Sequence, residues 1–552
     1  MKRILTMLLA MAMVFCLFAC SEQEIEESKK KSTSTASNPT TGITVPTTQS
    51  VEDEKIQETI AIQLGDYELS TTEVNYFYVD AINRYVEQYY YYIYFGYIRL
   101  DLTTPLNQQY VDVATTWADS FMDMAVENIK STYGLYDLAM KNDYTLNCDE
   151  TAELTGLESY LRNQAEDLGY RNVDQMLKDT YGSGATLSSY MEYYTICTYA
   201  SSYYTAYEEA LMYDAETLRA YEGAESYRYN SYSYSYYFVN VDSFVESDYP
   251  TTEQKAEAER ACKAFADRLA AGKYDTQSEF DFAIDYAMKE LNGEWNGVEE
   301  DEKPKYSSVV KNDELYGSIN SMFQNWIVGK SDDENTNLEV RNKGDMTVIE
   351  YLTGTGDSKI IKGYYVVRFE SCTDNAFALA NVRHILIKFE GGSYNATTGQ
   401  TTYTDAEKNA AKTVAEKLYN DFKAGTISED AFANLAMEHT DDSNGDNGGL
   451  YENVYPGQMI EQFNDWCFDE ARQAGDYDLI ETEYGWHLMF YVGDSEITYR
   501  DYMVSNDKRV EDMESWYENV KQSLNWTTVD LSNVPMDLVI NGEDSIWDKI
   551  FG

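Results

Sequence analysis

One order of secondary-structure elements occurs twice in this 552-residue chain, and this repetition constrains the fold more than any other feature. Each copy has a strand rich in β-branched or aromatic residues, two amphipathic helices and a closing strand. The predicted elements are Tyr237–Val241, Thr252–Ala271, Phe280–Leu291 and Gly363–Phe369 in the first copy, and Val382–Ile387, Thr404–Lys423, Glu429–Glu438 and Tyr484–Phe490 in the second. The pattern predicts a duplicated α+β module, not a solenoid.

The two copies differ in the segments before their closing strands. In the first copy we expect a long acidic loop rich in Asn and Gly between Leu291 and Gly363. The second copy has a Gly/Asp/Asn loop at Asp441–Gly449 and a predicted short helix near Met459–Phe468. The longer loop brings the first closing strand nearer to the second copy.

The region before the duplication has the pattern of a helical domain. Ile60–Ser70 predicts two short strands joined by a turn at Gly65-Asp66, and Ser70 with Glu73 forms a capping box for the next helix. No proline occurs between Pro105 and Pro250, and the apolar residues of Trp117–Met140 and Thr151–Leu168 recur at helical intervals. After the duplication, Ser515–Asn525 again has helical spacing, and we expect this tail to pack on the N-terminal domain.

The N-terminus has the pattern of a targeting signal. A positive start precedes the uncharged apolar run Ile4–Ala19, which has the length of a signal-peptide core. The run ends in Leu17-Phe18-Ala19-Cys20, which resembles a bacterial lipobox and implies diacylation of Cys20 and anchoring of the protein to the outer face of the cell membrane. An ordinary secretion signal or an uncleaved anchor is the alternative. The Ser/Thr-rich segment that follows predicts a disordered tether.

Composition excludes several classes of function. The formal net charge of −54 opposes binding to nucleic acid or to anionic membrane surfaces through basic patches. The chain has three histidines and no Cys-x-x-Cys pair, so we expect no metal site and no cofactor. The five cysteines beyond Cys20 are widely spaced and predict buried free thiols. All three histidines, His384, His439 and His487, lie in the second copy.

A series of short motifs in the second copy resembles the parvulin-type peptidyl-prolyl cis/trans isomerases. The motifs are Val382-Arg-His-Ile-Leu-Ile387, Phe432-Ala-Asn-Leu-Ala436, Thr440-Asp-Asp-Ser443, Gly449-Leu450, Gly457-Gln-Met459, Phe463 and Thr482-Glu-Tyr-Gly-Trp-His487. Each is weak alone, but their order and spacing are specific. The layout of the whole chain resembles the extracytoplasmic foldases of the PrsA/SurA type, which implies unfolded or newly secreted polypeptides with X–Pro bonds as partners.

The resemblance implies the site residues. As catalytic residues it gives His384 and His487 on adjacent strands, Asp442 and Thr482; as the apolar pocket for the proline ring it gives Leu450, Met459 and Phe463. Tyr451 stands where the family often has glycine. We interpret His439 as structural.

Rotation about an X–Pro bond requires the loss of amide resonance, against a barrier of about 18–20 kcal/mol. It needs no nucleophile or metal, because a site that binds the twisted amide better than the planar forms accelerates it. We therefore expect the polar residues to act as preorganised electrostatics and Asp442 not to attack covalently. The first copy has Tyr237 and Tyr365 near the histidine positions, so we expect it to be catalytically silent.

We therefore predict an α+β chain with a helical chaperone domain, two parvulin-like βα modules of which the first is degenerate, and a helical C-terminal tail. The predicted parts are a signal peptide (1–19), a tether (20–55), the helical domain (56–226), the degenerate module (227–377), the isomerase domain (378–494) and the tail (495–552). Two alternatives remain: a catalytically silent holdase chaperone, and a surface-binding lipoprotein on a parvulin scaffold.

Overall fold

The computed structural model describes residues 43–44, 59–245, 247, 249–294, 309–330, 338–356, 359–395 and 400–540. The chain divides into two compact units, residues 1–212 with 509–552 and residues 213–508. Both contain helices and sheets, so the fold is mixed α and β. Cys20 and the predicted signal peptide lie outside the described residues. None of the helices within the described ranges is both long enough and apolar enough to span a bilayer.

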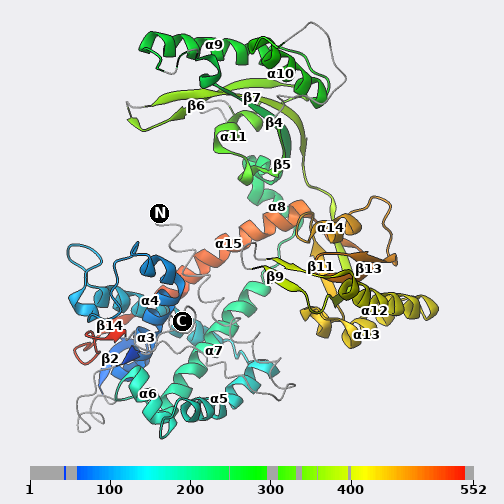
Figure 1. Ribbon diagram of the computed structural model, residues 1–552. Coiled ribbons are helices and arrows are strands. Elements are labelled where there is room, and N and C mark those ends of the chain that lie inside the picture. The colour runs from blue at the N-terminus through cyan, green and yellow to red at the C-terminus, as the bar shows by residue number, and fades with distance from the viewer. Residues whose placement is uncertain are drawn as a thin grey trace. The chain divides into compact units, whose positions relative to one another are not determined.

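The first unit is mainly helical (Figure 1). Its elements are β1 (Ile43–Thr44), β2 (Ile60–Leu64), β3 (Tyr67–Ser70), α3 (Thr71–Tyr94), α4 (Trp117–Lys141), α5 (Cys148–Asp167), α6 (Val173–Tyr181), α7 (Leu187–Glu209), β14 (Trp526–Thr528) and β15 (Val539–Ile540). The predicted capping box is present, because the Ser70 hydroxyl accepts from the amide of Glu73 and the Glu73 carboxylate accepts from the amide of Ser70. β1 lies in the predicted tether and pairs with β15. The expectation that the whole tether is disordered is therefore wrong for Ile43–Thr44.

The C-terminal tail contributes to the core of this unit. α15 (Tyr499–Gln522) begins in the second unit, and its last turns lie in the first. There Trp516 stacks on Tyr207 with ring centroids 3.8 Å apart, and Val520 packs against Gly134 of α4. A Cβ at Gly134 would lie 2.8 Å from the Val520 carbonyl oxygen, so this contact requires glycine. β14 then pairs antiparallel with β2.

The second unit contains two four-stranded sheets of the same topology. After α8 (Ala215–Glu222), the first module consists of β4 (Ser231–Asn240), α9 (Thr252–Ala270), α10 (Gln277–Leu291), β5 (Val310–Leu315), α11 (Ser321–Ile327), β6 (Met346–Thr353) and β7 (Ile360–Thr373). The second module consists of β8 (Ala378–Lys388), β9 (Ser393–Asn395), β10 (Gln400–Thr402), α12 (Asp405–Ala424), α13 (Glu429–His439), β11 (Leu450–Val454), α14 (Glu461–Cys467), β12 (Tyr477–Glu481) and β13 (Gly485–Thr498). The strand orders are β5-β4-β7-β6 and β11-β8-β13-β12.

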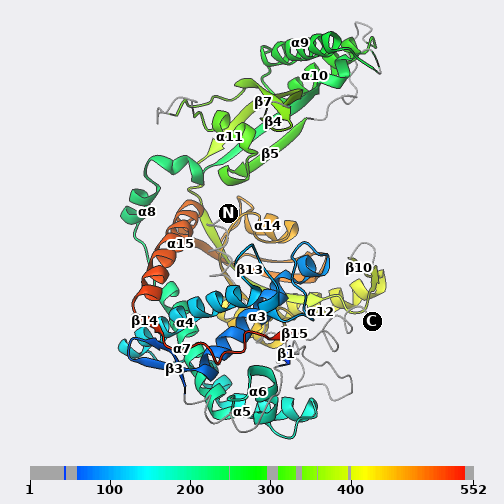
Figure 2. The ribbon, with the colours of Figure 1, turned by 90° about the vertical axis from the view of Figure 1, so that its left-hand side faces the viewer.

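In each module the helices cover both faces of the sheet (Figures 1 and 2). In the first module α9 and α10 pack on one face of β4 and β7, and α11 packs on the other. In the second, α12 and α13 pack on one face of β8 and β13, and α14 packs on the other. The central strands are therefore covered on both sides, and most of their residues are buried or half-buried.

The segment expected to be one long loop before the first closing strand contains β5, α11 and β6, so that expectation is wrong. Both strands lie at sheet edges. An edge strand pairs on one side only and tolerates polar residues, which weakens its sequence signal. The expectation of buried thiols holds only in part: the five cysteines among the described residues form no disulfide, but Cys148 and Cys372 are exposed.

Candidate active site

The pairing of β8 with β13 places two histidines side by side. His384 is opposite Met489, and His487 is opposite Leu386, so the two histidines are diagonal neighbours on one face of the sheet. Their rings are nearly parallel, with an interplanar angle of 13°, and the two Nδ1 atoms are 3.0 Å apart. Both side chains are buried.

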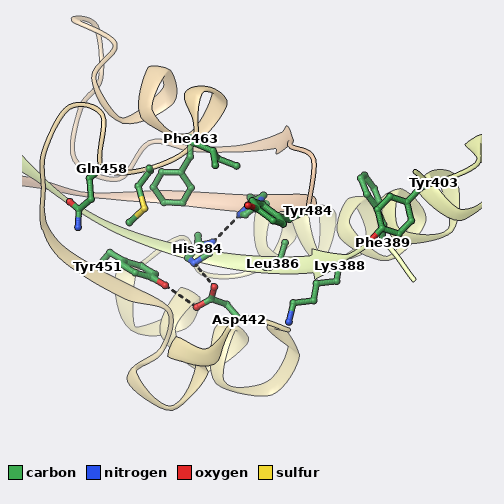
Figure 3. Close-up of a pocket in the computed structure, with 13 residues that line it drawn as sticks. His384, Leu386, Lys388, Phe389, Tyr403, Asp442, Tyr451, Gln458, Phe463 and Tyr484 are labelled. Atoms are coloured by element: carbon green, nitrogen blue, oxygen red, sulfur yellow. Dashed lines mark hydrogen bonds and ion pairs between the residues drawn. The ribbon is translucent and has the colours of Figure 1, made fainter. Parts of the chain in front are cut away.

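A threonine and an aspartate extend this pair at its two ends. The Thr482 hydroxyl lies 2.9 Å from His487 Nε2; it also accepts from the amide of Tyr484 and donates to the Gly485 carbonyl. At the other end, Asp442 Oδ2 lies 3.6 Å from His384 Nε2, which has no other partner among the residues that the structure describes (Figure 3).

Two hydrogen-bond donors hold the Asp442 carboxylate in place. Its Oδ1 accepts from the amide of Asn444 at 2.9 Å and from the Tyr451 hydroxyl at 3.0 Å. The Tyr451 ring also packs on His384, with centroids 5.2 Å apart. The carboxylate is therefore fixed by two hydrogen bonds in addition to its contact with His384.

Burial and these contacts set the charges of the site. The pKa of the Asp442 carboxyl is held well below its usual range, mainly by its contact with His384, against the opposing effect of burial. Burial, followed by the charge of His384, lowers the pKa of His487 to about 3. At neutral pH Asp442 is thus ionised and His487 is neutral.

One arrangement of protons satisfies every contact along this chain. Thr482 donates to Gly485, so it accepts from Nε2–H of His487, and the Nδ1 of neutral His487 is then an acceptor. His384 then donates to that nitrogen through Nδ1–H, and its Nε2 faces the Asp442 carboxylate.

The polar chain opens into a pocket with a volume of about 430 Å³. The pocket is lined by His384, Leu386, Lys388, Phe389, Tyr403, Asp442, Tyr451, Gln458, Met459, Ile460, Phe463, Tyr484 and His487. Phe463 of α14 packs edge-on against both imidazoles, with centroids 5.3 Å from His384 and 6.0 Å from His487. The arrangement offers an apolar socket directly beside a fixed polar network.

Comparison with protein families decides what this module is. Residues 364–493 match the family model described as the PPIC-type PPIase domain. The chain carries a parvulin-type peptidyl-prolyl isomerase domain. The match begins within β7, ahead of the boundary predicted at residue 378.

Solved structures similar to the chain include the PPIase domain of TbPar42, with 22% identity over 20% of this chain and 98% of that one, at a TM-score of 0.17. PrsA from Bacillus cereus is 18% identical over 30% of this chain and 56% of that one, at a TM-score of 0.17. PrsA from Bacillus subtilis is 20% identical over 29% of this chain and 54% of that one, at a TM-score of 0.18. The chain thus spans little more than half of the PrsA structures. A search of curated proteins found no match.

The isomerase domain brings most of the predicted site residues together. His384, His487, Asp442, Met459 and Phe463 all line the pocket. Thr482 does not line it but is buried behind His487. His439, interpreted as structural, lies at the end of α13 with an exposed side chain.

The prediction that Leu450 lines the pocket is corrected by the pairing of β11 with β8. Leu450 is opposite Arg383, which faces Glu429 of α13, whereas Tyr451 is opposite Val382 on the pocket face. Alternation along a strand allows only one of two neighbours to face the pocket, and here that residue is Tyr451.

Sequence reasoning also missed Leu386, Lys388 and Tyr403 in the isomerase domain. The signal for the first two was available, because Leu386 and Lys388 follow His384 at intervals of two along β8. Tyr403 approaches from beyond the β9–β10 hairpin, and no local pattern in the sequence predicts that contact.

The first module has aromatic residues where the isomerase domain has its histidines. Tyr236 and Tyr365 occupy the same diagonal on β4 and β7, with rings 5.6 Å apart, and Phe323 of α11 packs 5.1 Å from each. The expected counterpart Tyr237 is therefore wrong by one residue, because Tyr237 packs on the opposite face with α9 and α10.

Proposed function

We propose that the pocket of the isomerase domain binds the proline ring of an X–Pro segment and that the polar chain beside it stabilises the twisted amide without covalent attack. The observation that carries this proposal is the contact of Phe463 with both imidazoles. A proline ring held against Phe463 and Met459 leaves its amide beside His384 and Asp442.

The four polar residues have distinct roles in this proposal. Asp442 fixes the position of His384 at one end of the chain, and Thr482 holds the neutral His487 in the tautomer that accepts from His384. Donors and acceptors fixed before the substrate arrives lose no energy to reorganisation as the carbonyl rotates, which lowers the barrier for the twisted form.

The surroundings of Asp442 argue against nucleophilic attack by its carboxylate. One oxygen accepts two hydrogen bonds, the other faces His384, and the low pKa of the group makes it a weak nucleophile. We assign Asp442 to the positioning of His384.

A protease-coupled assay of proline-peptide isomerisation tests the site, with the full chain as enzyme. Phe463→Ala removes the aromatic wall of the socket, and we expect kcat/KM to fall at least tenfold. Phe468→Ala is the matched control, because Phe468 caps the same helix without lining the pocket. Equal rates for the two variants would contradict the assignment of the socket.

We further propose that the first module is catalytically silent and that the whole chain is an extracytoplasmic foldase anchored through lipidated Cys20. Support for silence comes from Tyr236 and Tyr365 in place of the histidines, since their hydroxyls do not reproduce an Asp–His–His–Thr chain. Support for the anchor comes from the lipobox-like sequence before Cys20. Newly secreted polypeptides with X–Pro bonds are the proposed clients.

Each of these roles has a separate test. Incorporation of a labelled fatty acid in a bacterial host should occur in the wild-type chain and be lost in Cys20→Ser; labelling of the variant would contradict the anchor. Refolding of a proline-limited client should accelerate with the wild-type chain and not with Phe463→Ala. Suppression of aggregation by both proteins without any acceleration would favour the holdase alternative.

A further inference from the structure

The pocket is longer than a proline ring requires. Its wall along β8 runs from His384 through Leu386 to Lys388, about 13 Å at the rise of an extended strand. The far end is aromatic: Phe389 and Tyr403 lie 5.2 Å apart, on the side of His384 away from Gln458 (Figure 3). We call Leu386, Phe389, Tyr403 and Tyr484 the aromatic end of the pocket.

Local contacts hold the aromatic end in place. Tyr403 immediately precedes Thr404, the N-cap of α12, whose capping box with Glu407 is complete. Glu407 also accepts from the amide of Gly392, and a Cβ on Gly392 would lie 2.8 Å from the Tyr403 ring. The backbone of Phe389 is fixed to Tyr484, because its amide donates to the Tyr484 carbonyl at 3.1 Å.

The chemistry of the bond says which residue reaches this end. The carbonyl of the rotating amide belongs to the residue before proline, so with the proline ring on Phe463 that carbonyl meets His384 and Asp442. Beyond His384 the pocket face of β8 continues through Leu386 toward Tyr403, and the side chain of the same residue can extend along this wall.

From this geometry we infer that the aromatic end binds the side chain of the residue preceding proline and selects an aromatic one. The inference rests on the proposed function of the pocket. Edge-to-face and stacked contacts with Tyr403 and Tyr484 reward an aromatic ring over an aliphatic or small side chain.

The charges at this end decide between aromatic and charged partners. Lys388 lines the pocket, and Lys408 lies over the Phe389 ring at 5.2 Å while paired with Glu481, so a cationic side chain is disfavoured. The Lys388 side chain is exposed, and an exposed ion pair with an acidic residue contributes little compared with burial of an aromatic ring.

The test compares peptides Ala-X-Pro-Phe with X as Phe, Ala, Glu or Lys, turned over by the full chain. We expect kcat/KM for Phe to exceed that for Ala by about tenfold and Lys to be the poorest. Tyr403→Ala should bring the Phe-to-Ala ratio close to one, and Tyr403→Phe should preserve it. Tyr394→Ala, an exposed tyrosine in the adjacent hairpin that does not line the pocket, should leave the ratio unchanged.

Equal rates for Phe and Ala, or a higher rate for Glu than for Phe, would overturn the inference. Affinities of the same four peptides, measured by fluorescence anisotropy with a label at the N-terminus, separate it from the proposed function. Tighter binding of the Phe peptide without any turnover would refute catalysis and support the aromatic end. Turnover with equal rates and equal affinities for the four peptides would support catalysis and refute the selectivity of the aromatic end.

Discussion

The buried neutral state of His487 makes the isomerase domain sensitive to acid. Burial lowers the pKa of His487 in the folded state to about 3, from 6.5 for the free side chain. A lowered histidine pKa means that the unfolded chain binds the proton first, so stability is complete above pH 6.5 and falls as the pH drops toward 3. At about 1.4 kcal/mol per pH unit, the loss at pH 4.5 is about 3 kcal/mol.

Two measurements on the full chain test this value. The chain has three histidines, so ring Cε1 signals from labelled histidine are few and can be assigned with variants. The His487 signal should not titrate between pH 7 and 4.5. Urea unfolding, followed by proteolytic protection of isomerase-domain fragments, should show the stability loss in wild type and lose that dependence in His487→Gln.

His439→Gln is the matched control, because the His439 side chain is exposed at the end of α13. It should retain the wild-type dependence on pH. Asp442 does not contribute to the pH dependence of stability in this range. Its lowered pKa affects stability only below about pH 4, the pKa of an unperturbed aspartate. A His487 signal that titrates near pH 6.5 would refute the reasoning about burial.

Two further predictions concern other contacts. Thr482→Val leaves buried His487 Nε2 without its partner and should lower the stability of the domain by about 1–3 kcal/mol in urea unfolding. Thr482→Ser keeps the hydroxyl and should retain most of the wild-type stability. Equal losses in the two variants would contradict the role of the hydroxyl. Gly134→Ala forces a Cβ against Val520 and should lower the thermal midpoint of the first unit, at a cost of about 1–3 kcal/mol, whereas Gly156→Ala in open space on α5 should raise it; a neutral Gly134→Ala would show that the tail does not pack there.

The sequence predicted the buried elements of the second unit well and its edge strands poorly. Helices such as α9 and α12 are amphipathic, and the central strands β4 and β8 carry aromatic or β-branched residues, so both give strong local signals. Of the six strands missed in the modules, β5, β6, β11 and β12 lie at sheet edges, and β9 and β10 pair only with each other. Their positions follow from tertiary pairing, which a local pattern does not report.

The site shows the same limit at single residues. The resemblance to parvulins indicated His384 and His487, but whether Leu450 or Tyr451 faces the pocket depends on strand register. A shift of one residue reverses the face, as it also does for Tyr236 and Tyr237 in the first module. Motifs supply the chemistry, whereas pairing decides which neighbour takes part.

The central claim is that the pocket beside the two histidines accelerates rotation about X–Pro bonds. Exchange NMR on an Ala-Ala-Pro-Phe peptide measures this without a coupling protease, because cis and trans signals exchange rapidly only when the bond is catalysed. Catalytic amounts of the full chain should give strong exchange cross-peaks, and His487→Ala should reduce them to the background of the free peptide. Equal exchange with wild type and His487→Ala would contradict the claim.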